Sequence, residues 1–146
     1  MQTPVSLINR RSLRELVPWS QTHDTGVLAY SPLQSGLLSG SFDTQRAAEL
    51  PADDWRRSSR DFRQPSLDDN LALAERLRPI AKRHGVEVAA VAVAWVLEQP
   101  GVTAAIVGAR RPSQLEAWLP AGSLRLDARD LEEIAAAIEE TGAGRE

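Results

Sequence analysis

The chain has 146 residues, a formal net charge of −3 at pH 7 and the apolar and charged content of one ordinary globular domain. This charge excludes a general attraction to nucleic acid or to an anionic membrane, and no apolar run approaches the length of a membrane span. The absence of cysteine excludes disulfides, thiolate nucleophiles and cysteine-ligated metals. Lys82 is the single lysine beside sixteen arginines, which leaves almost no candidate for a catalytic lysine. With no recognisable signal peptide, we expect a cytoplasmic protein.

The first thirty residues predict a strand, a helix and a second strand. Residues 5–8 form a short apolar segment that is consistent with a strand. Ser12 followed by Glu15 has the spacing of a capping box and predicts an amphipathic helix, which Pro18 interrupts. The apolar run after Gly26 predicts the second strand. This β-α-β order is typical of parallel sheet with a right-handed crossover.

The segment 26–40 reads G-V-L-A-Y-S-P-L-Q-S-G-L-L-S-G, an apolar strand that ends in a polar, glycine-rich turn. Pro32 stops strand pairing. Glycines allow backbone N–H groups to approach an anion, and α/β proteins commonly bind ligands where a strand ends in this way. The same composition is equally typical of an ordinary loop, and the pattern alone favours the loop.

Residues 41–65 are polar and irregular and predict a long surface loop with short helical turns. Trp55 and Phe62 indicate that this loop docks onto the rest of the protein. A lid over a ligand and a variable insertion anchored by two aromatic residues are equally compatible with the pattern.

The second half of the chain predicts more helices and a third strand. Ser66 is expected to cap a helix that Pro79 bends and Gly85 ends. Residues 88–99 are apolar nearly all round, which favours a helix buried against a sheet, with a strand as the alternative. Residues 103–107 predict a strand that is buried on both faces.

Two further helices complete the predicted elements. Pro112 is at a permitted first position of one helix, and Asp127 is expected to cap the last one. Residues 142–146 are expected to form a frayed tail. His23 and His84 both fall near the end of a helical stretch, where capping explains an imidazole better than catalysis does.

The ends of two predicted strands carry the residues that are best suited to bind a ligand. Tyr30 offers a flat ring followed by small hydroxyl residues, whereas Arg110 and Arg111 follow the last strand and precede a helix. The carboxyl ends of parallel strands open on the same face of a sheet. The pair therefore indicates a site for a ligand with a planar ring at one end and phosphate at the other.

Four segments together resemble one family, the aldo-keto reductases. They are V-S-L-I-N-R, G-V-L-A-Y-S-P-L-Q-S-G-L-L-S-G, A-V-A-W-V-L and A-A-I-V-G-A-R-R-P-S-Q-L. The resemblance runs from about residue 2 to residue 138 and concerns the carboxyl-terminal part of the family, from its sixth barrel strand onward. It implies an α/β fold, a partial (β/α)8 TIM barrel with three parallel strands and flanking helices, and it implies an oxidoreductase that reduces small carbonyl compounds.

The resemblance also implies NADP(H) as the cofactor and a role for each matching residue. Gln2 matches the glutamine that hydrogen-bonds the nicotinamide carboxamide, and Tyr30 matches the aromatic residue that stacks on the nicotinamide ring. The loop that wraps the pyrophosphate matches Ser31, Pro32, Leu33, Ser35 and Gly36.

At the other end of the cofactor, Gly108, Arg110 and Gln114 match positions around the adenosine 2′-phosphate and the adenine. Arg57 matches a basic residue that closes over the cofactor, in a loosely aligned loop. One departure is the sequence Ala-Trp at 117–118, where the family commonly has Glu-Asn near the adenine; the tryptophan either stacks on the adenine or packs in the core.

The family's catalytic Asp, Tyr, Lys and His belong to a part of the family that precedes the segments matched here. This chain has one tyrosine, assigned to the cofactor loop, and one lysine, expected on a solvent-facing helix position. We therefore expect a cofactor site, no catalytic residues and no metal site.

Three hypotheses follow. The chain is the carboxyl-terminal part of an NADP-dependent aldo-keto reductase, separated from its first five strands; or it is a stand-alone nucleotide-binding or interaction module; or it assembles with another chain that supplies the missing strands. Three parallel strands cannot close a barrel, so we also expect a marginally stable chain and self-association through open sheet edges.

Overall fold

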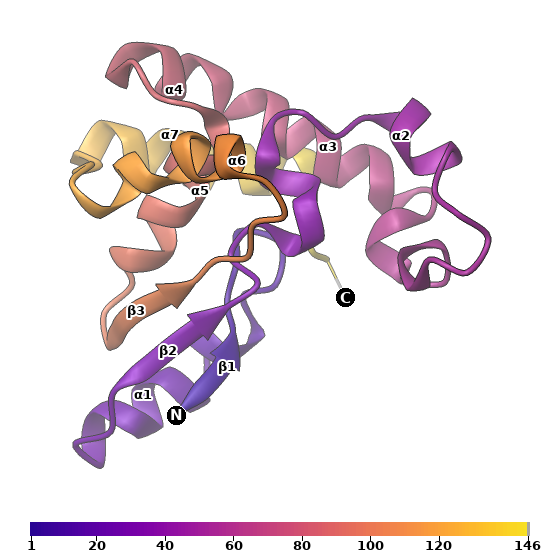
Figure 1. Cartoon of the computed structure of the whole chain (residues 1–146). Helices are drawn as coiled ribbons and strands as arrows, with labels where there is room; N and C mark the ends of the chain where they lie inside the picture. The colour runs from indigo at the N-terminus through magenta and orange to yellow at the C-terminus, as the bar shows by residue number, and fades with distance from the viewer. Residues whose placement is uncertain (146) are drawn as a thin grey trace.

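The computed structural model describes residues 1–145, which form a small parallel sheet covered on one side by helices (Figure 1). The three strands are β1 (Gln2–Pro4), β2 (Val27–Tyr30) and β3 (Val102–Ile106), and they lie in that order. Both pairs are parallel, with Thr3 opposite Ala29 and Ala29 opposite Ala105. The predicted α/β fold with three parallel strands is confirmed.

The helices are α1 (Leu16–Thr22), α2 (Thr44–Ala48), α3 (Ser66–Arg76), α4 (Arg78–His84), α5 (Val88–Leu97), α6 (Pro112–Trp118) and α7 (Ala128–Thr141). The 3-10 turns are η1 (Arg11–Leu13), η2 (Gln34–Ser39), η3 (Trp55–Arg57), η4 (Arg60–Phe62) and η5 (Leu119–Gly122).

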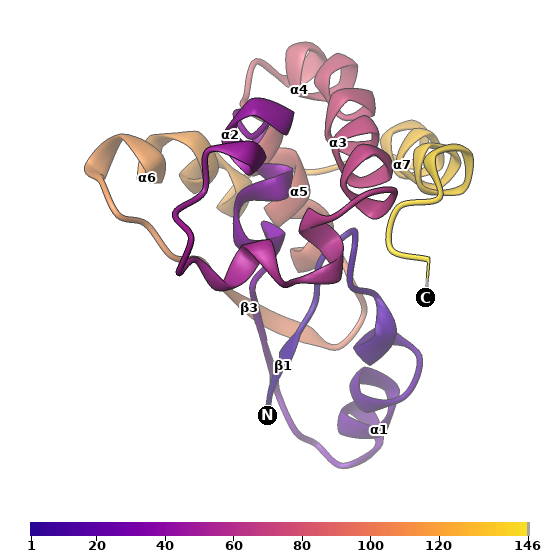
Figure 2. The ribbon, with the colours of Figure 1, turned by 90° about the vertical axis from the view of Figure 1, so that its right-hand side faces the viewer.

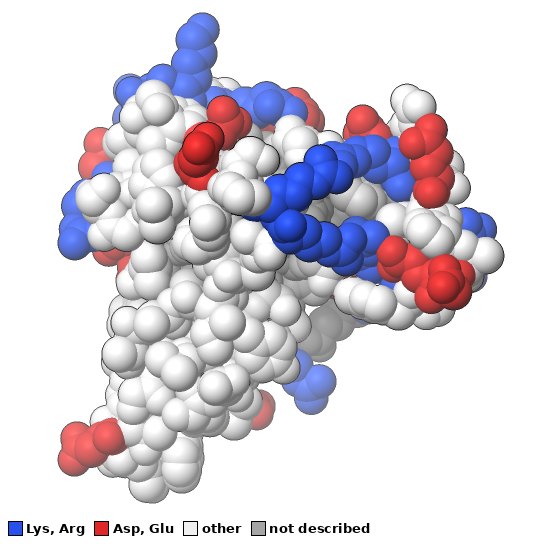
Figure 3. Space-filling model, in the orientation of Figure 1, with Lys and Arg blue, Asp and Glu red and all other residues white. Residues whose placement is uncertain are grey.

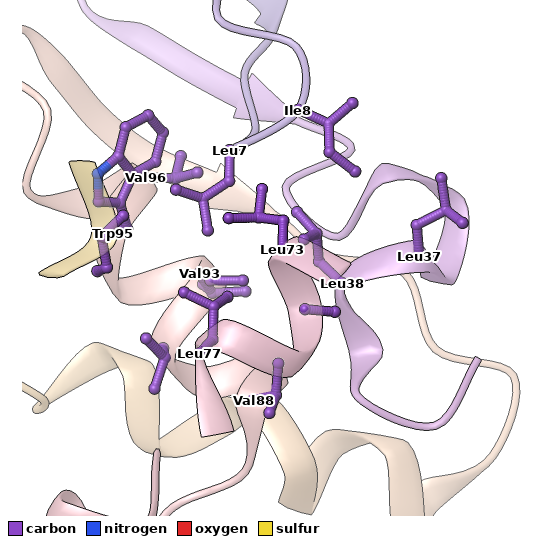
Figure 4. Packing of buried hydrophobic residues seen from close by; sticks show 14 of the residues in the cluster. Leu7, Ile8, Leu37, Leu38, Leu73, Leu77, Val88, Val93, Trp95 and Val96 are labelled. Carbon is purple, nitrogen blue, oxygen red and sulfur yellow. The ribbon is translucent and has the colours of Figure 1, made fainter. Parts of the chain in front are cut away.

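Helix α5 is the centre of the hydrophobic core. Every residue from Val88 to Val96 is buried, as expected for a helix that is apolar on all sides. Figure 4 shows Val93 of α5 close to Leu7, Leu73 and Leu77, which come from the chain after β1 and from α3 and its end. The helical prediction for this segment is confirmed and the strand alternative is wrong.

Proline and glycine divide the helices as the sequence predicts. Pro79 lies in the first turn of α4, where its missing N–H costs no hydrogen bond, and α3 ends before it. Gly85 follows α4 with a left-handed φ of 65°. Ser66, in contrast, is the first residue of α3 rather than its N-cap, because Pro65 takes that position and no side chain caps the helix.

The first strand and the first helix differ from the prediction. The strand is β1 at residues 2–4, not 5–8, because the Ser6 hydroxyl accepts hydrogen bonds from the backbone N–H groups of Ile8 and Asn9 and turns the chain there. Ser12 does not cap a helix. Its buried hydroxyl hydrogen-bonds the Thr3 hydroxyl at 2.6 Å, and α1 begins only at Leu16.

One face of the sheet is exposed in this chain. Leu28, Tyr30 and Ile106 have 36%, 40% and 43% of their surface accessible. The first two are on the central strand β2, and Ile106 of β3 is paired with Tyr30. The prediction that the third strand is buried on both faces is therefore wrong. The cause is that none of the elements within residues 1–145 covers this face, and all the helices pack elsewhere.

The segment 41–65 contains α2, η3 and η4 and is anchored by one aromatic residue rather than two. Phe62 is buried and packs edge-to-face against Phe42 with the ring centres 5.5 Å apart. Trp55 remains 61% exposed. Phe62 belongs to the hydrophobic core cluster that α3 and α5 also form, so the predicted docking of this loop is carried by Phe62.

The tail after α7 is ordered against the start of the chain as far as residue 145, contrary to the prediction of fraying. Ala143 is fully buried, and its carbonyl accepts a hydrogen bond of 3.1 Å from Arg10 Nη2. At Gly144 a side chain is impossible, because a Cβ would lie 1.9 Å from the Ile8 carbonyl oxygen. Figure 2 shows this segment passing from α7 toward the first residues of the chain. The last residue of the predicted tail, Glu146, lies outside the described residues.

Candidate functional site

The carboxyl ends of β2 and β3 open into a groove of about 770 Å³. Tyr30 and Ile106 lie at the strand ends, and the chain after each strand forms one wall. Phe42, Arg46 and Trp55 of the 41–65 segment line it as well. In Figure 3 the Lys and Arg side chains lie close together between α6 and the α2 side of the molecule. The 41–65 segment, for which the sequence allowed either a lid or a variable insertion, therefore contributes to the groove.

Most residues that the sequence singles out for cofactor binding line this one groove. They are Tyr30, Ser31, Pro32, Leu33, Ser35, Gly36, Gly108, Arg110 and Gln114. Gln2 does not line the groove. It is exposed at the start of β1, opposite Leu28, and so shares the exposed face of the sheet with Tyr30. Arg57 does not line the groove. Its Nη1 donates a 2.8 Å hydrogen bond to the Leu50 carbonyl, and the neighbouring Arg56 lines the groove instead.

The loop after β2 holds an unusual backbone conformation. Ser31, Gln34 and Ser35 have φ values of 56°, 44° and 53°, in the left-handed region that non-glycine residues rarely adopt. Gly36 has φ 104° and no atom within 4 Å of the position that a Cβ would occupy. Strained loops of this kind concentrate at binding sites, and the bare backbone at Gly36 leaves space for a ligand to approach.

The Gln34 side chain fixes this loop to the rest of the fold. Its Oε1 accepts a 2.9 Å hydrogen bond from the Ser6 hydroxyl, and its Nε2 donates one of 2.7 Å to Asp61 Oδ2. The loop is thereby tied both to the chain after β1 and to η4. This loop, which forms one wall of the groove, is therefore held in position before a ligand binds.

On the other wall, Gln114 organises the turn after β3. Its Oε1 accepts hydrogen bonds from the backbone N–H groups of Arg110 at 2.6 Å and Arg111 at 3.1 Å. This contact satisfies donors at the start of α6 and sets the path of the two arginines. The carbonyl oxygen of Gln114 is therefore engaged within the protein, and only its amide NH₂ is left to contact a ligand.

The groove is strongly cationic. Arg46, Arg56, Arg110 and Arg111 line it. Asp54 forms a two-point contact with Arg56, with distances of 2.9 Å to Nε and 2.6 Å to Nη2. This hydrogen bonding, with a smaller contribution from the charge of Arg110, lowers the pKa of Asp54 to about 2. With four arginines among its lining residues, the groove favours an anionic ligand.

Comparison with known proteins assigns the chain to a family. The model of the aldo/keto reductase family matches residues 1–139. The chain belongs to this family.

Individual aldo/keto reductases agree with this assignment. Aldo-keto reductase YhdN of Bacillus subtilis is 32% identical over 142 residues, which are 97% of this chain and 42% of that protein. Probable aldo-keto reductase 1 of Glycine max is 30% identical, over 94% of this chain and 39% of that protein. The structure of the glycerol dehydrogenase AKR11B4 from Gluconobacter oxydans matches with a TM-score of 0.86 and 30% identity, over 96% of this chain and 42% of that one. The chain thus spans about two fifths of the length of these relatives, and its three strands are part of a TIM barrel.

Trp118 shows the core packing that was one of its two predicted alternatives, whereas its stacking on an adenine stays a prediction. It packs against the core and also lines the groove. Its Nε1 is buried and has no hydrogen-bond acceptor among the described residues. A buried N–H donor usually has a partner, so this nitrogen marks a place where a ligand atom could accept a hydrogen bond.

The side chains available for acid–base chemistry lie apart from each other. Tyr30 lies at the groove, whereas Lys82 is exposed on α4, outside it. His23 and His84 are at the ends of α1 and α4, as expected, and His84 Nε2 contacts Asp130 at 2.7 Å. Within residues 1–145 no three His, Cys, Asp or Glu side chains are placed to hold a metal ion. None of the helices described combines the length and apolar character that crossing a bilayer requires.

Proposed function

We propose that this chain is the cofactor-binding, carboxyl-terminal part of an NADP-dependent aldo-keto reductase that reduces aldehydes or ketones. The observation that supports this is the groove itself. All the expected cofactor residues except Gln2 and Arg57 line it, and it lies at the carboxyl ends of two parallel strands, where barrels and open α/β sheets bind ligands. The compartment of the proposal is the cytoplasm.

The residues present fit a nicotinamide dinucleotide. The volume of about 770 Å³ is in the range of cofactor sites. In the proposal Tyr30 stacks on the nicotinamide ring, the loop at 31–36 contacts the pyrophosphate, and Arg110 with Arg111 binds the 2′-phosphate, which distinguishes NADP from NAD. The bound cofactor supplies the hydride, and this chain supplies binding and orientation.

In the proposal the proton donor comes from outside this chain. Tyr30 is the single tyrosine and faces the cofactor groove, and Lys82 is exposed on α4. A tyrosine needs a cationic neighbour to donate a proton efficiently at neutral pH. We therefore expect the isolated chain to bind NADPH weakly and not to reduce carbonyl compounds.

A second candidate function is a nucleotide-binding module that assembles with another chain. The exposed central sheet face, with Leu28 and Ile106, favours it. If a chain carrying the other barrel strands is mixed with this one, carbonyl reduction is expected to appear in the mixture. Continued inactivity of a stable mixed complex would count against that assembly.

Calorimetric titration of the purified chain with NADPH and NADH tests the principal proposal. The variant Arg110→Gln loses one charge-assisted contact with the 2′-phosphate. It is expected to bind NADPH roughly tenfold more weakly, whereas NADH, which has no 2′-phosphate, is expected to lose much less affinity. Arg125→Gln removes an exposed arginine outside the groove and serves as the matched control. Absence of NADPH binding by the folded chain, or equal losses in both variants, would contradict the proposal.

A further inference from the structure

A second, smaller cavity lies beside the loop that follows β2. It has a volume of about 130 Å³, and Gln34 lines it, whereas Leu33 and Ser35 on either side line the large groove. The two cavities therefore share this loop but have separate linings. No role in the proposed cofactor site falls on the residues of the small cavity.

Five arginines line the small cavity, which we call the arginine pocket. They come from three separate parts of the chain: Arg10, Arg11, Arg14, Arg60 and Arg145. The one acidic lining residue is Asp61, whose Oδ2 already accepts the hydrogen bond from Gln34. A chain with net charge −3 thus concentrates positive charge at one small concave site.

Three of these arginines are held in place by backbone carbonyls. Arg10 donates to the carbonyls of Leu7 and Ala143, Arg60 donates to that of Arg145 at 2.8 Å, and Arg145 donates to that of Glu139 at 3.0 Å. Anchoring by neutral acceptors positions the guanidinium groups without cancelling their charge. The pocket is therefore arranged before any ligand arrives.

Among the described residues, the five arginines of the pocket outnumber its acidic lining residue, Asp61. No carboxylate of residues 1–145 forms an ion pair within 4.0 Å with any of the five, whereas other arginines, such as Arg56, Arg83 and Arg129, form ion pairs. Arg10 is partly desolvated, and its burial together with the charge of Arg14 lowers its pKa. Like charges held together at a partly buried site are costly, and a bound anion offsets that cost.

We propose that the arginine pocket binds a small oxyanion, a phosphate or a carboxylate group. Guanidinium forks match both groups in two-point hydrogen bonding. The volume accommodates one such group and is too small for a dinucleotide, which separates this site from the proposed cofactor groove. The proposal does not depend on the proposed function, because the two sites have different lining residues.

Titration of the full chain with inorganic phosphate and with succinate, at constant ionic strength, tests the proposal by calorimetry. Arg11 and Arg14 are exposed at the pocket and have no hydrogen bond from their side chains among the described contacts, so replacing them leaves the fold intact. In the double variant Arg11→Gln with Arg14→Gln, phosphate or succinate affinity is expected to fall by about tenfold. Arg125→Gln is the matched control and retains the affinity of the original chain.

The variants distinguish the arginine pocket from the cofactor groove, and the two anions distinguish a phosphate ligand from a carboxylate ligand. NADPH binding by the double variant is expected to equal that of the original chain, and Arg110→Gln is expected to bind phosphate normally. Tighter binding of phosphate than of succinate identifies a phosphate ligand, and the reverse order identifies a carboxylate. The proposal is overturned if neither anion binds the folded chain, if the double variant binds as well as the control, or if Arg110→Gln abolishes phosphate binding. Equal thermal midpoints of all variants confirm that the comparison is between folded proteins.

Discussion

At the scale of single residues, the indole nitrogen of Trp118 has the clearest unmet requirement. It is buried beside the groove without an acceptor among the described residues. An unsatisfied buried donor costs about 1–3 kcal/mol, and a cofactor atom that accepts from it removes this cost on binding. In Trp118→Phe the packing ring remains and the donor is lost. NADPH affinity measured by calorimetry is expected to fall by roughly fivefold, with an equal or slightly higher thermal midpoint.

The rim residue Trp55 provides the control for this prediction. Its side chain is 61% exposed, so its N–H is solvated in the free protein. Trp55→Phe is expected to leave NADPH affinity within about twofold, since a solvated donor gains little on binding. Equal affinity of Trp118→Phe and the original chain would show that the cofactor does not use this nitrogen.

The sequence predicted well which residues line the groove where a backbone segment sets their position, and poorly where a side-chain contact does. The strand ends placed Tyr30 and Arg110 correctly at one groove, because parallel strands end at the same edge of a sheet. The choice between Arg56 and Arg57 was beyond the sequence. Two adjacent arginines look alike in a sequence, and their side-chain contacts distinguish them. Arg56 contacts Asp54, whereas Arg57 donates to the Leu50 carbonyl.

At the scale of elements, a buried carboxylate joins two helices. Asp130, in the first turn of α7, has no exposed side-chain surface and accepts hydrogen bonds from Arg83 at 2.5 Å and His84 at 2.7 Å, at the end of α4. Burial acts to raise the pKa of Asp130, but the hydrogen bonds from Arg83 and His84 outweigh it, so the pKa is lowered overall. The contact is therefore strongest when Asp130 is ionised.

This network makes the stability of the fold sensitive to acid. A carboxylate with a lowered pKa stabilises the fold fully above its unfolded value, about pH 4, and loses that contribution as the pH falls through its folded value. Asp130→Asn is expected to reduce the free energy of unfolding by about 2 kcal/mol at pH 7, and by progressively less as the pH falls through the lowered pKa of Asp130. Urea unfolding as a function of pH measures both differences.

Glu133→Gln is the control for the acid prediction, because Glu133 is a partly exposed partner of the same Arg83. Because solvent screens this partner, its removal is expected to cost much less than the removal of the Asp130 charge. If Asp130→Asn had the same small effect as this control, the buried contact would not hold α4 and α7 together.

The elements themselves were predicted unevenly, for identifiable reasons. Helix α5 was evident because its apolar residues cover all sides, which only a buried helix requires. β1 was misplaced because a strand of three residues has too short a pattern to recognise, and the stronger apolar run at 5–8 is a turn held by Ser6. The docked tail was missed because its packing depends on Arg10 and Ile8, more than a hundred residues away.

At the scale of the whole molecule, the exposed central face of the sheet predicts self-association. Leu28, Tyr30 and Ile106 are all more than a third exposed on it, and β1 and β3 each have one edge without a partner strand within residues 1–145. Sedimentation velocity is expected to show dimers or larger species whose fraction rises with concentration. Leu28→Glu places a charge on this face and is expected to shift the distribution toward the monomer.

The matched control for self-association is Leu119→Glu, which changes a leucine that is 65% exposed on η5, away from the sheet. Its sedimentation profile is expected to equal that of the original chain. A sharp monomer at all concentrations for the original chain would contradict the prediction.

The fold class was predictable from the sequence because several segments agreed with one family, but the exposed face was not. The apolar run of β3 indicated burial on both sides, and in this chain Ile106 is 43% exposed. The apolar pattern of a strand indicates which of its faces suit burial, but burial itself depends on neighbouring elements, and none within residues 1–145 covers this face.

The fluorescence of two of the four tryptophans reports on whether the groove is occupied. Trp55 and Trp118 line it, while Trp95 is 8% exposed in the core and Trp19 is on α1. Indole emission overlaps the absorption of a reduced nicotinamide ring, so energy transfer from the two groove tryptophans would quench their emission when such a ring is bound. The protein therefore needs no added dye for its occupancy to be followed in solution.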